Sequence, residues 1–160
     1  MLQEMLINAV CSFFGTLGFA LMFHVPKKYF FSCGMTGVAG WMVYKIVVTY
    51  TVFSSAVASF LGAFIVVLIS RILTVVKKCP ITIFLISGIV PLVPGAGVYF
   101  TAYYLVTNEL TLAAQKGIDA VKVAFGIVLG IVFVLSIPRE FFGIRYWKQR
   151  LLFSRRERNS

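Results

Sequence analysis

Long apolar stretches follow one another along this chain, separated by short polar or basic segments. The uninterrupted stretches run over about Leu2–Phe23, Tyr29–Val48, Phe53–Val76 and Ile118–Pro138. Each is close to the ~20 residues that a helix needs to cross a bilayer. The pattern therefore predicts membrane-spanning helices. The turn near residues 49–53 contains neither Gly nor Pro and is the least clearly marked boundary.

The remaining stretch, from Pro80 to Thr107, is apolar but is interrupted at its centre by Pro91-Leu92-Val93-Pro94-Gly95-Ala96-Gly97. Each proline removes a backbone N–H and disturbs the preceding helical turn. A helix from Pro80 to Pro91 rises about 16 Å, which is about half of a ~30 Å hydrocarbon core. We therefore expect a full crossing, fourth in the chain, that is broken near the membrane midplane.

A broken helix inside a membrane is tolerated only where protein or a water-filled cavity covers it, so the break predicts a binding site. The second half-helix begins there with free N–H groups and a partial positive charge, which suits a carboxylate. The first half ends in carbonyls, which suit an ammonium group. The alternative is a kinked packing helix, since proline is common in membrane helices. The predicted binding residues are Pro91, Pro94, Gly95, Ala96, Gly97, Tyr99, Thr101 and Tyr103.

Small residues on two other predicted spans indicate close helix packing. They recur every third residue in the second span and form a G-x-x-x-G motif in the last one. These glycines are Gly34, Gly37, Gly40, Gly126 and Gly130.

The composition supports a membrane protein. Of 160 residues, 60% are hydrophobic and 12% are charged, whereas a soluble domain carries about 25% charged residues. We therefore predict an all-α integral membrane protein, with residues 1–138 as a single five-helix domain. Residues 139–160 are basic and amphipathic, and predict an interfacial helix that binds anionic lipids.

The net charge of +10 is distributed as expected for membrane topology, so it does not indicate nucleic-acid binding. With five spans, the cationic side holds Lys27, Lys28, Arg71, Lys77, Lys78 and the tail cations. The other side holds only Lys45, Lys116 and Lys122. The positive-inside rule then places the N-terminus outside the cell and the C-terminus in the cytoplasm.

Candidate catalytic chemistry is missing from the pattern. The chain has no paired carboxylates, His/Cys cluster or Ser-His-Asp set at one depth, so we predict no enzyme, metal or cofactor. Cys11, Cys33 and Cys79 are too far apart for a C-x-x-C motif. Glu4 and Glu109 are candidates for coupling transport to protons. The acids at or between the predicted spans, Glu4, Glu109, Asp119 and Glu140, all fall near span ends, so we expect the coupling acid mainly in a partner.

Three groups of residues resemble the threonine/serine exporter family. They are Gly18-Phe19-Ala20 with Phe23-His24-Val25-Pro26, Ser70-Arg71 with Pro80, and Pro91-Leu92-Val93-Pro94-Gly95 with Tyr99. Over Gly15–Pro138 the chain is similar to the short subunit that corresponds to the C-terminal membrane half of fused exporters. The resemblance implies a larger membrane subunit as partner, export of small amino acids or of dicarboxylates such as succinate, and a bacterial inner membrane.

Three other readings stay open at this point. The chain is alternatively a non-transporting scaffold or regulatory subunit that stabilises a partner. Glycine-rich and broken helices also line pores, so a channel is a second alternative. Five spans make a thin wall for a solute pathway, and self-association is an alternative to a different partner.

Overall fold

The computed structural model describes residues 2–138, and the regular elements in this range are all helices. In chain order they are α1 (Leu2–Met22), the 3₁₀ turn η1 (Lys27–Tyr29), α2 (Phe30–Tyr50), α3 (Ser55–Lys77), α4 (Thr82–Ile89), the 3₁₀ turn η2 (Val90–Leu92), α5 (Gly95–Val106) and α6 (Leu110–Ser136). The interfacial helix predicted for residues 139–160 lies outside the described part of the chain.

Four helices, α1, α2, α3 and α6, are long and apolar enough to cross a membrane. The pair Thr82–Leu92 and Gly95–Val106 provides a fifth span if its two halves, which meet at a bend of 49°, form one crossing. The predicted fold class is confirmed at this level, as a helical protein with four to five candidate membrane spans.

The last span begins earlier than the sequence predicts. The prediction of a start near Ile118 is wrong, because α6 begins at Leu110. The polar residues Gln115 and Lys116 interrupt the apolar run, which hides the first two turns from a hydropathy pattern. Those turns are helical because α5 packs along them: a Cβ added at Gly117 would lie 3.3 Å from Thr101 Cγ2.

The glycines of α2 lie at its contacts with two neighbouring helices. A Cβ at Gly34 would collide with the ring of Phe13 on α1, and one at Gly37 would collide with Thr16 on the same helix. On another side of α2, a Cβ at Gly40 would collide with a side chain of α3. These three positions therefore allow α2 to approach α1 and α3 closely.

The glycines of α6 bring its backbone against that of α3. A Cβ at Gly126 would collide with the carbonyl oxygen of Ala56, and one at Gly130 would lie 2.6 Å from the carbonyl oxygen of Phe60. Backbone atoms cannot turn aside as side chains do. The α3–α6 contact therefore depends on glycine at both positions.

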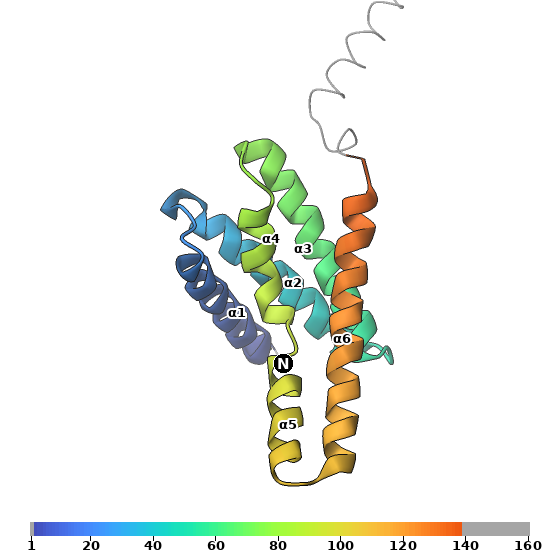
Figure 1. Ribbon diagram of the computed structural model, residues 1–160. Coiled ribbons are helices and arrows are strands. Elements are labelled where there is room, and N and C mark those ends of the chain that lie inside the picture. Colours follow the sequence, from blue (N-terminus) through green and yellow to red (C-terminus); the bar gives the residue numbers. More distant parts are fainter. Residues whose placement is uncertain (1, 139–160) are drawn as a thin grey trace, which may run out of the picture.

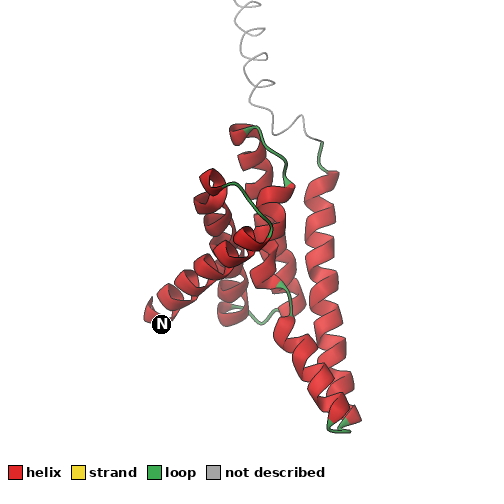
Figure 2. Ribbon diagram, turned by 60° about the vertical axis from the view of Figure 1, so that its left-hand side comes forward, coloured by secondary structure: helices red, strands yellow, loops and turns green. Residues whose placement is uncertain are grey.

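Helices α1 to α4 form a bundle, with α2 in contact with α1, α3 and α4 (Figure 1). Helix α5 and the first half of α6 form a hairpin that extends beyond one end of this bundle, as a second view also shows (Figure 2). The second half of α6 returns along α3. The chain thus consists of a packed bundle and a projecting hairpin, and the break between α4 and α5 lies where the two meet.

Candidate functional site

The break is made by two prolines that act on successive turns. Helix α4 ends at Ile89, and Pro91 lies in the 3₁₀ turn η2, where a missing N–H is tolerated. Val93 precedes Pro94 and is extended, with φ −62° and ψ 131°. A residue before proline is pushed out of the helical region in this way. The N–H of Val93 donates back to the carbonyl of Val90 at 3.1 Å, so the first half closes on itself before the bend.

The second half begins with backbone donors that point into the break. The N–H of Gly95 donates to the carbonyl of Val93 at 2.7 Å, and that of Val98 donates to the carbonyl of Pro94 at 3.0 Å. Between them, the N–H groups of Ala96 and Gly97 have no acceptor among residues 2–138. Two donors and the positive end of α5 therefore lie together, an arrangement that suits an anion.

The depth of the break can be compared with the helices that pack around it. Along α6 the break lies half-way: Leu92 packs in one cluster with Ile127, and Gly97 lies against Ala120. Beside α2 and α3, Leu92 packs on Gly40 and Gly62, and the bend that follows it lies toward the α2–α3 connection (Figure 2). The predicted midplane depth stays a prediction, and the contact of Leu92 with Gly40, half-way along α2, is compatible with it.

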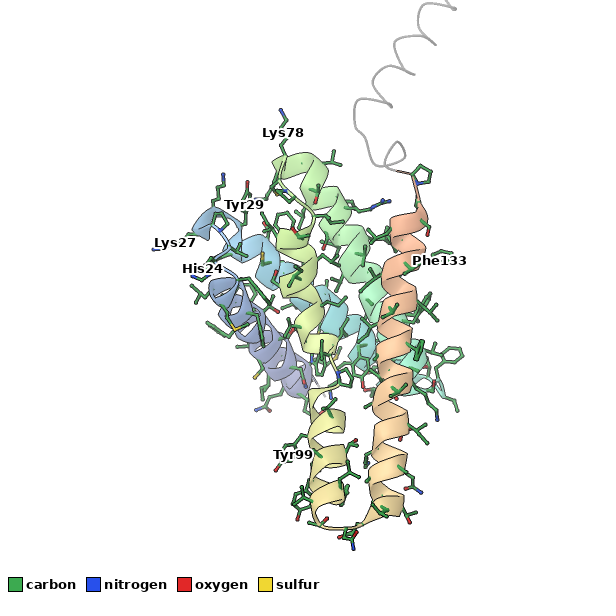
Figure 3. All side chains as sticks on the ribbon, in the orientation of Figure 1. His24, Lys27, Tyr29, Lys78, Tyr99 and Phe133 are labelled. Atoms are coloured by element: carbon green, nitrogen blue, oxygen red, sulfur yellow. The ribbon has the colours of Figure 1, made fainter. Side chains whose placement is uncertain are left out.

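The predicted site residues divide between two faces of α5. Gly97 and Thr101 face α6, and the Thr101 hydroxyl donates to the Gly97 carbonyl at 2.7 Å. Tyr99 and Tyr103 stack on each other with ring centroids 6.5 Å apart, and they are 65% and 50% exposed. Figure 3 shows Tyr99 pointing away from α6. The three hydroxyl side chains expected to act together are thus separated, because residues four apart share a helix face and residues two apart do not.

The two predicted coupling acids lie away from the break. Glu4 lines a cavity of about 230 Å³ between the start of α1 and the end of α2, together with Asn8 and Lys45. Trp41 donates to Asn8 in the same region, at 3.4 Å. Glu109 is exposed in the turn between α5 and α6, at the far end of the hairpin (Figure 1). Of the two, Glu4 is the one that lines a described cavity.

An acid that was expected near a span end lies beside the break instead. Asp119 is on α6 and forms an ion pair with Lys122 at 3.6 Å, with both side chains about two-thirds exposed. Its neighbour Ala120 contacts Gly97, and Val123, one turn further on, packs on the cluster that contains Leu92. Asp119 is therefore the sequence neighbour of a residue that contacts the start of α5, although its own side chain is exposed. The i, i+3 spacing of opposite charges was the available signal in the sequence.

The structure thus defines a class: a helical protein with four to five candidate membrane spans, in which one pair of apolar helices is broken at a bend of 49°. The family model described as Threonine/Serine exporter, ThrE, matches residues 8–137, which is most of the chain. This chain belongs to the threonine/serine exporter family, as the sequence motifs predict. No curated protein and no solved structure matches it.

Proposed function

We propose that this chain is a membrane subunit of a secondary exporter for small metabolites that carry a carboxylate. The solutes are amino acids of the threonine/serine type or dicarboxylates of the succinate type. The observation that carries the proposal is the start of α5, where the N–H groups of Ala96 and Gly97 lack acceptors within the described residues. Membership of an exporter family supports a transport role for this site.

The chemistry of the break suits such a solute. A helix N-terminus carries about half a positive charge, so a carboxylate that accepts from these two N–H groups is stabilised there. The short α4–η2 half ends close by in carbonyl groups, which favour an ammonium group. An amino acid carries both a carboxylate and an ammonium group, so it can use both ends of the break. A dicarboxylate has a second carboxylate, which needs a positive group elsewhere. Lys122 is the nearest described candidate along α6, since its ion pair adjoins the Ala120–Gly97 contact.

Asp119 joins Glu4 and Glu109 as a candidate for proton coupling. Its ion pair with Lys122 is exposed, and such a pair is weak enough to exchange partners when a charged solute arrives. Its sequence neighbour Ala120 contacts Gly97 near the start of α5, whereas Glu109 lies at the far end of the hairpin.

The rest of the binding site is proposed to come from a larger membrane subunit. Helix α5 has no buried residue, although its sequence is apolar and aromatic. The exposed stack of Tyr99 and Tyr103 carries hydroxyl groups on a face that this chain leaves open. We place the pair of subunits in a bacterial inner membrane, with the N-terminus outside and the C-terminus in the cytoplasm.

The test is a double substitution at the break, Pro94→Ala with Gly95→Ala, in the chain co-expressed with its larger subunit. A Cβ at Gly95 meets nothing within 4 Å, so the variant removes the break without a clash. The matched control is Gly15→Ala on α1, where a Cβ also meets nothing. We expect efflux of L-threonine or succinate to fall at least tenfold, about 1.4 kcal/mol, in the double variant and to be unchanged in the control.

Unchanged efflux in the double variant, at normal protein abundance, would contradict a solute site at the break. A fall in efflux that follows the abundance of the larger subunit would instead support the scaffold reading. Transport that shows no counterflow and saturates little with solute would support a channel.

A further inference from the structure

A second cavity lies at the opposite end of the bundle from the α2–α3 connection, between the end of α3, the linker to α4 and the end of α6. Its volume is about 580 Å³. Its ionisable lining groups within the described residues are Arg71, Lys78 and the Cys79 thiol, and its apolar walls include Pro80, Ile81 and Leu135. This cavity is separate from the break and from the predicted solute site.

Arg71 holds a fixed positive charge beside this cavity. It is only 8% exposed, and its guanidinium donates to the carbonyl of Leu135 at 3.1 Å and to that of Ile137. Carbonyls at the end of a helix have no intrahelical donor, so Arg71 caps α6 from the side of α3. The same contacts determine where the guanidinium lies, because a planar fork that holds two carbonyls cannot rotate freely.

Two more positive groups lie near the mouth of the cavity. Lys78 ends α3 in a left-handed conformation, with φ 50°, and its side chain extends off the end of the bundle (Figure 3). The first N–H groups of α4 add to it. Those of Ile83 and Phe84 donate to Pro80 and Ile81, whereas those of Ile81 and Thr82 have no acceptor among the described residues.

We propose that this cavity binds the phosphate group of an anionic membrane phospholipid. Lys78 and the N–H groups at the start of α4 contact the phosphate oxygens, and Arg71 supplies the positive charge behind them. Basic pockets between membrane helices bind lipid headgroups in this way. The inference does not depend on the solute that the break binds, nor on the basic tail.

A lipid is favoured over free phosphate because the surroundings of the cavity are apolar. Ile72 and Val76 on α3 are 51% and 58% exposed, and Leu135 on α6 is 42% exposed. Leu135 lines the cavity itself together with Val75, Pro80 and Ile81, so an apolar surface adjoins the charged mouth. Acyl chains can lie against this surface while the phosphate occupies the cavity. Free phosphate gains nothing from it.

The test measures binding of phosphatidylglycerol to the full chain in nanodiscs of neutral phosphatidylcholine. Binding is followed by native mass spectrometry and by the rise in unfolding temperature. Measurements at 0.5 M NaCl suppress long-range attraction to the basic surface as a whole, because the Debye length falls to about 4 Å, and leave contacts at hydrogen-bond distance. Inorganic phosphate is the second probe, in the same nanodiscs.

Lys78→Gln is the main variant, and Lys27→Gln is the matched control, since it removes the same charge at the same end of the bundle but outside the cavity. We expect Lys78→Gln to weaken phosphatidylglycerol binding about fivefold, the effect of one basic residue near an anionic surface, and Lys27→Gln to leave it unchanged. Arg71→Lys keeps the charge but loses the fork, and should bind less than the wild type. If Arg71→Lys does not fold, the comparison of Lys78→Gln with Lys27→Gln still tests the proposal.

Equal losses in Lys78→Gln and Lys27→Gln would overturn the proposal, because binding would then be a property of the whole basic surface. An equal rise in unfolding temperature with inorganic phosphate alone would also overturn it, since the site would then take free phosphate. Retention of phosphatidylglycerol by the wild type and by Lys27→Gln at 0.5 M NaCl, with weaker binding in Lys78→Gln, supports it.

Discussion

The two halves of the bent helix pair, Thr82–Leu92 and Gly95–Val106, have similar lengths and similar apolar composition, but buried residues occur only in the first. In the first half, Phe84, Ser87, Gly88 and Leu92 are buried, and α4 and η2 contact α1, α2 and α3. In the second half no residue is buried, and the main contact of α5 is with α6. Burial therefore follows the neighbours that the fold supplies, and hydropathy alone does not distinguish the two halves.

The difference separates two roles. The first half, α4 with η2, contributes to both buried clusters. Phe84 packs with Ala20, Tyr29 and Cys33 in one, and Leu92 packs with Val66 in the other. The α5 half presents unpaired N–H groups and exposed aromatic rings. We infer that the first half stabilises this chain, and that the second half serves contacts with a solute and a partner.

The largest expected effect comes from truncating one phenylalanine in each half. Phe84 is fully buried and packs edge-on against Tyr29, with ring centroids 5.7 Å apart. Phe84→Ala should cost about 2–4 kcal/mol, mainly from the cavity it leaves, because packing replaces the hydrophobic effect as the driving force between membrane helices. Phe100 on α5 is 44% exposed, and Phe100→Ala should cost less than about 1 kcal/mol. Unfolding titrations in mixed micelles measure both, and equal costs would remove the distinction between the halves.

A smaller effect is expected from adding volume at one glycine in each half. A Cβ at Gly88 would lie 2.9 Å from Thr36 and 3.2 Å from Val66, whereas one at Gly95 meets nothing within 4 Å. Gly88→Leu should therefore destabilise the chain by about 1–3 kcal/mol, and Gly95→Leu should be nearly neutral. The same titrations apply. A large cost at Gly95 would mean that the start of α5 is covered in the chain alone.

The third effect concerns the partner and leaves the stability of this chain unchanged. Tyr99→Ala removes an exposed ring from α5, and Phe14→Ala removes a similarly exposed ring, 67%, from α1. If α5 faces the larger subunit, Tyr99→Ala should reduce the co-purified partner about tenfold, as loss of an aromatic anchor of about 1.4 kcal/mol does. Phe14→Ala should have no such effect. Equal retention of the partner by both variants would contradict this assignment.

The smallest effect on stability is expected at the ion pair beside the break. Asp119 and Lys122 are about two-thirds exposed, so Lys122→Gln should change the free energy of unfolding by no more than about 0.5 kcal/mol. Asp119→Asn should be equally mild in unfolding titrations but should alter the pH dependence of efflux. An Asp119→Asn variant with the wild-type pH profile would return the coupling role to Glu4, to Glu109 or to the partner.

Much of the fold is predictable from the sequence because helices that cross a membrane must be long, apolar and bounded by charges. The spans at α1 to α3 and the break at Pro91–Gly97 follow from those requirements and from the chemistry of proline. The start of α6 does not, because Gln115 and Lys116 look like a connecting segment until α5 is seen beside them.

For the candidate site, the sequence predicts local features but not which helices and side chains lie next to one another. The sequence indicates which backbone groups the break frees, but it does not show that Thr101 turns toward α6 while Tyr99 and Tyr103 turn away. It also cannot show that Asp119 lies beside the break, because this depends on the register between α5 and α6. The side-chain directions on α5 and the position of Asp119 both depend on contacts between segments that are distant in the sequence.

The contacts of the broken span also have a consequence for biosynthesis. When α4 leaves the ribosome, its partners α1, α2 and α3 have already been made, whereas the only extensive partner of α5 is α6, which follows it. The prolines therefore divide the chain at the point where packing onto earlier helices gives way to packing onto a later one. A nascent chain that stops at the end of α5 should already bury Phe84, whereas α5 should still lack its main packing neighbour.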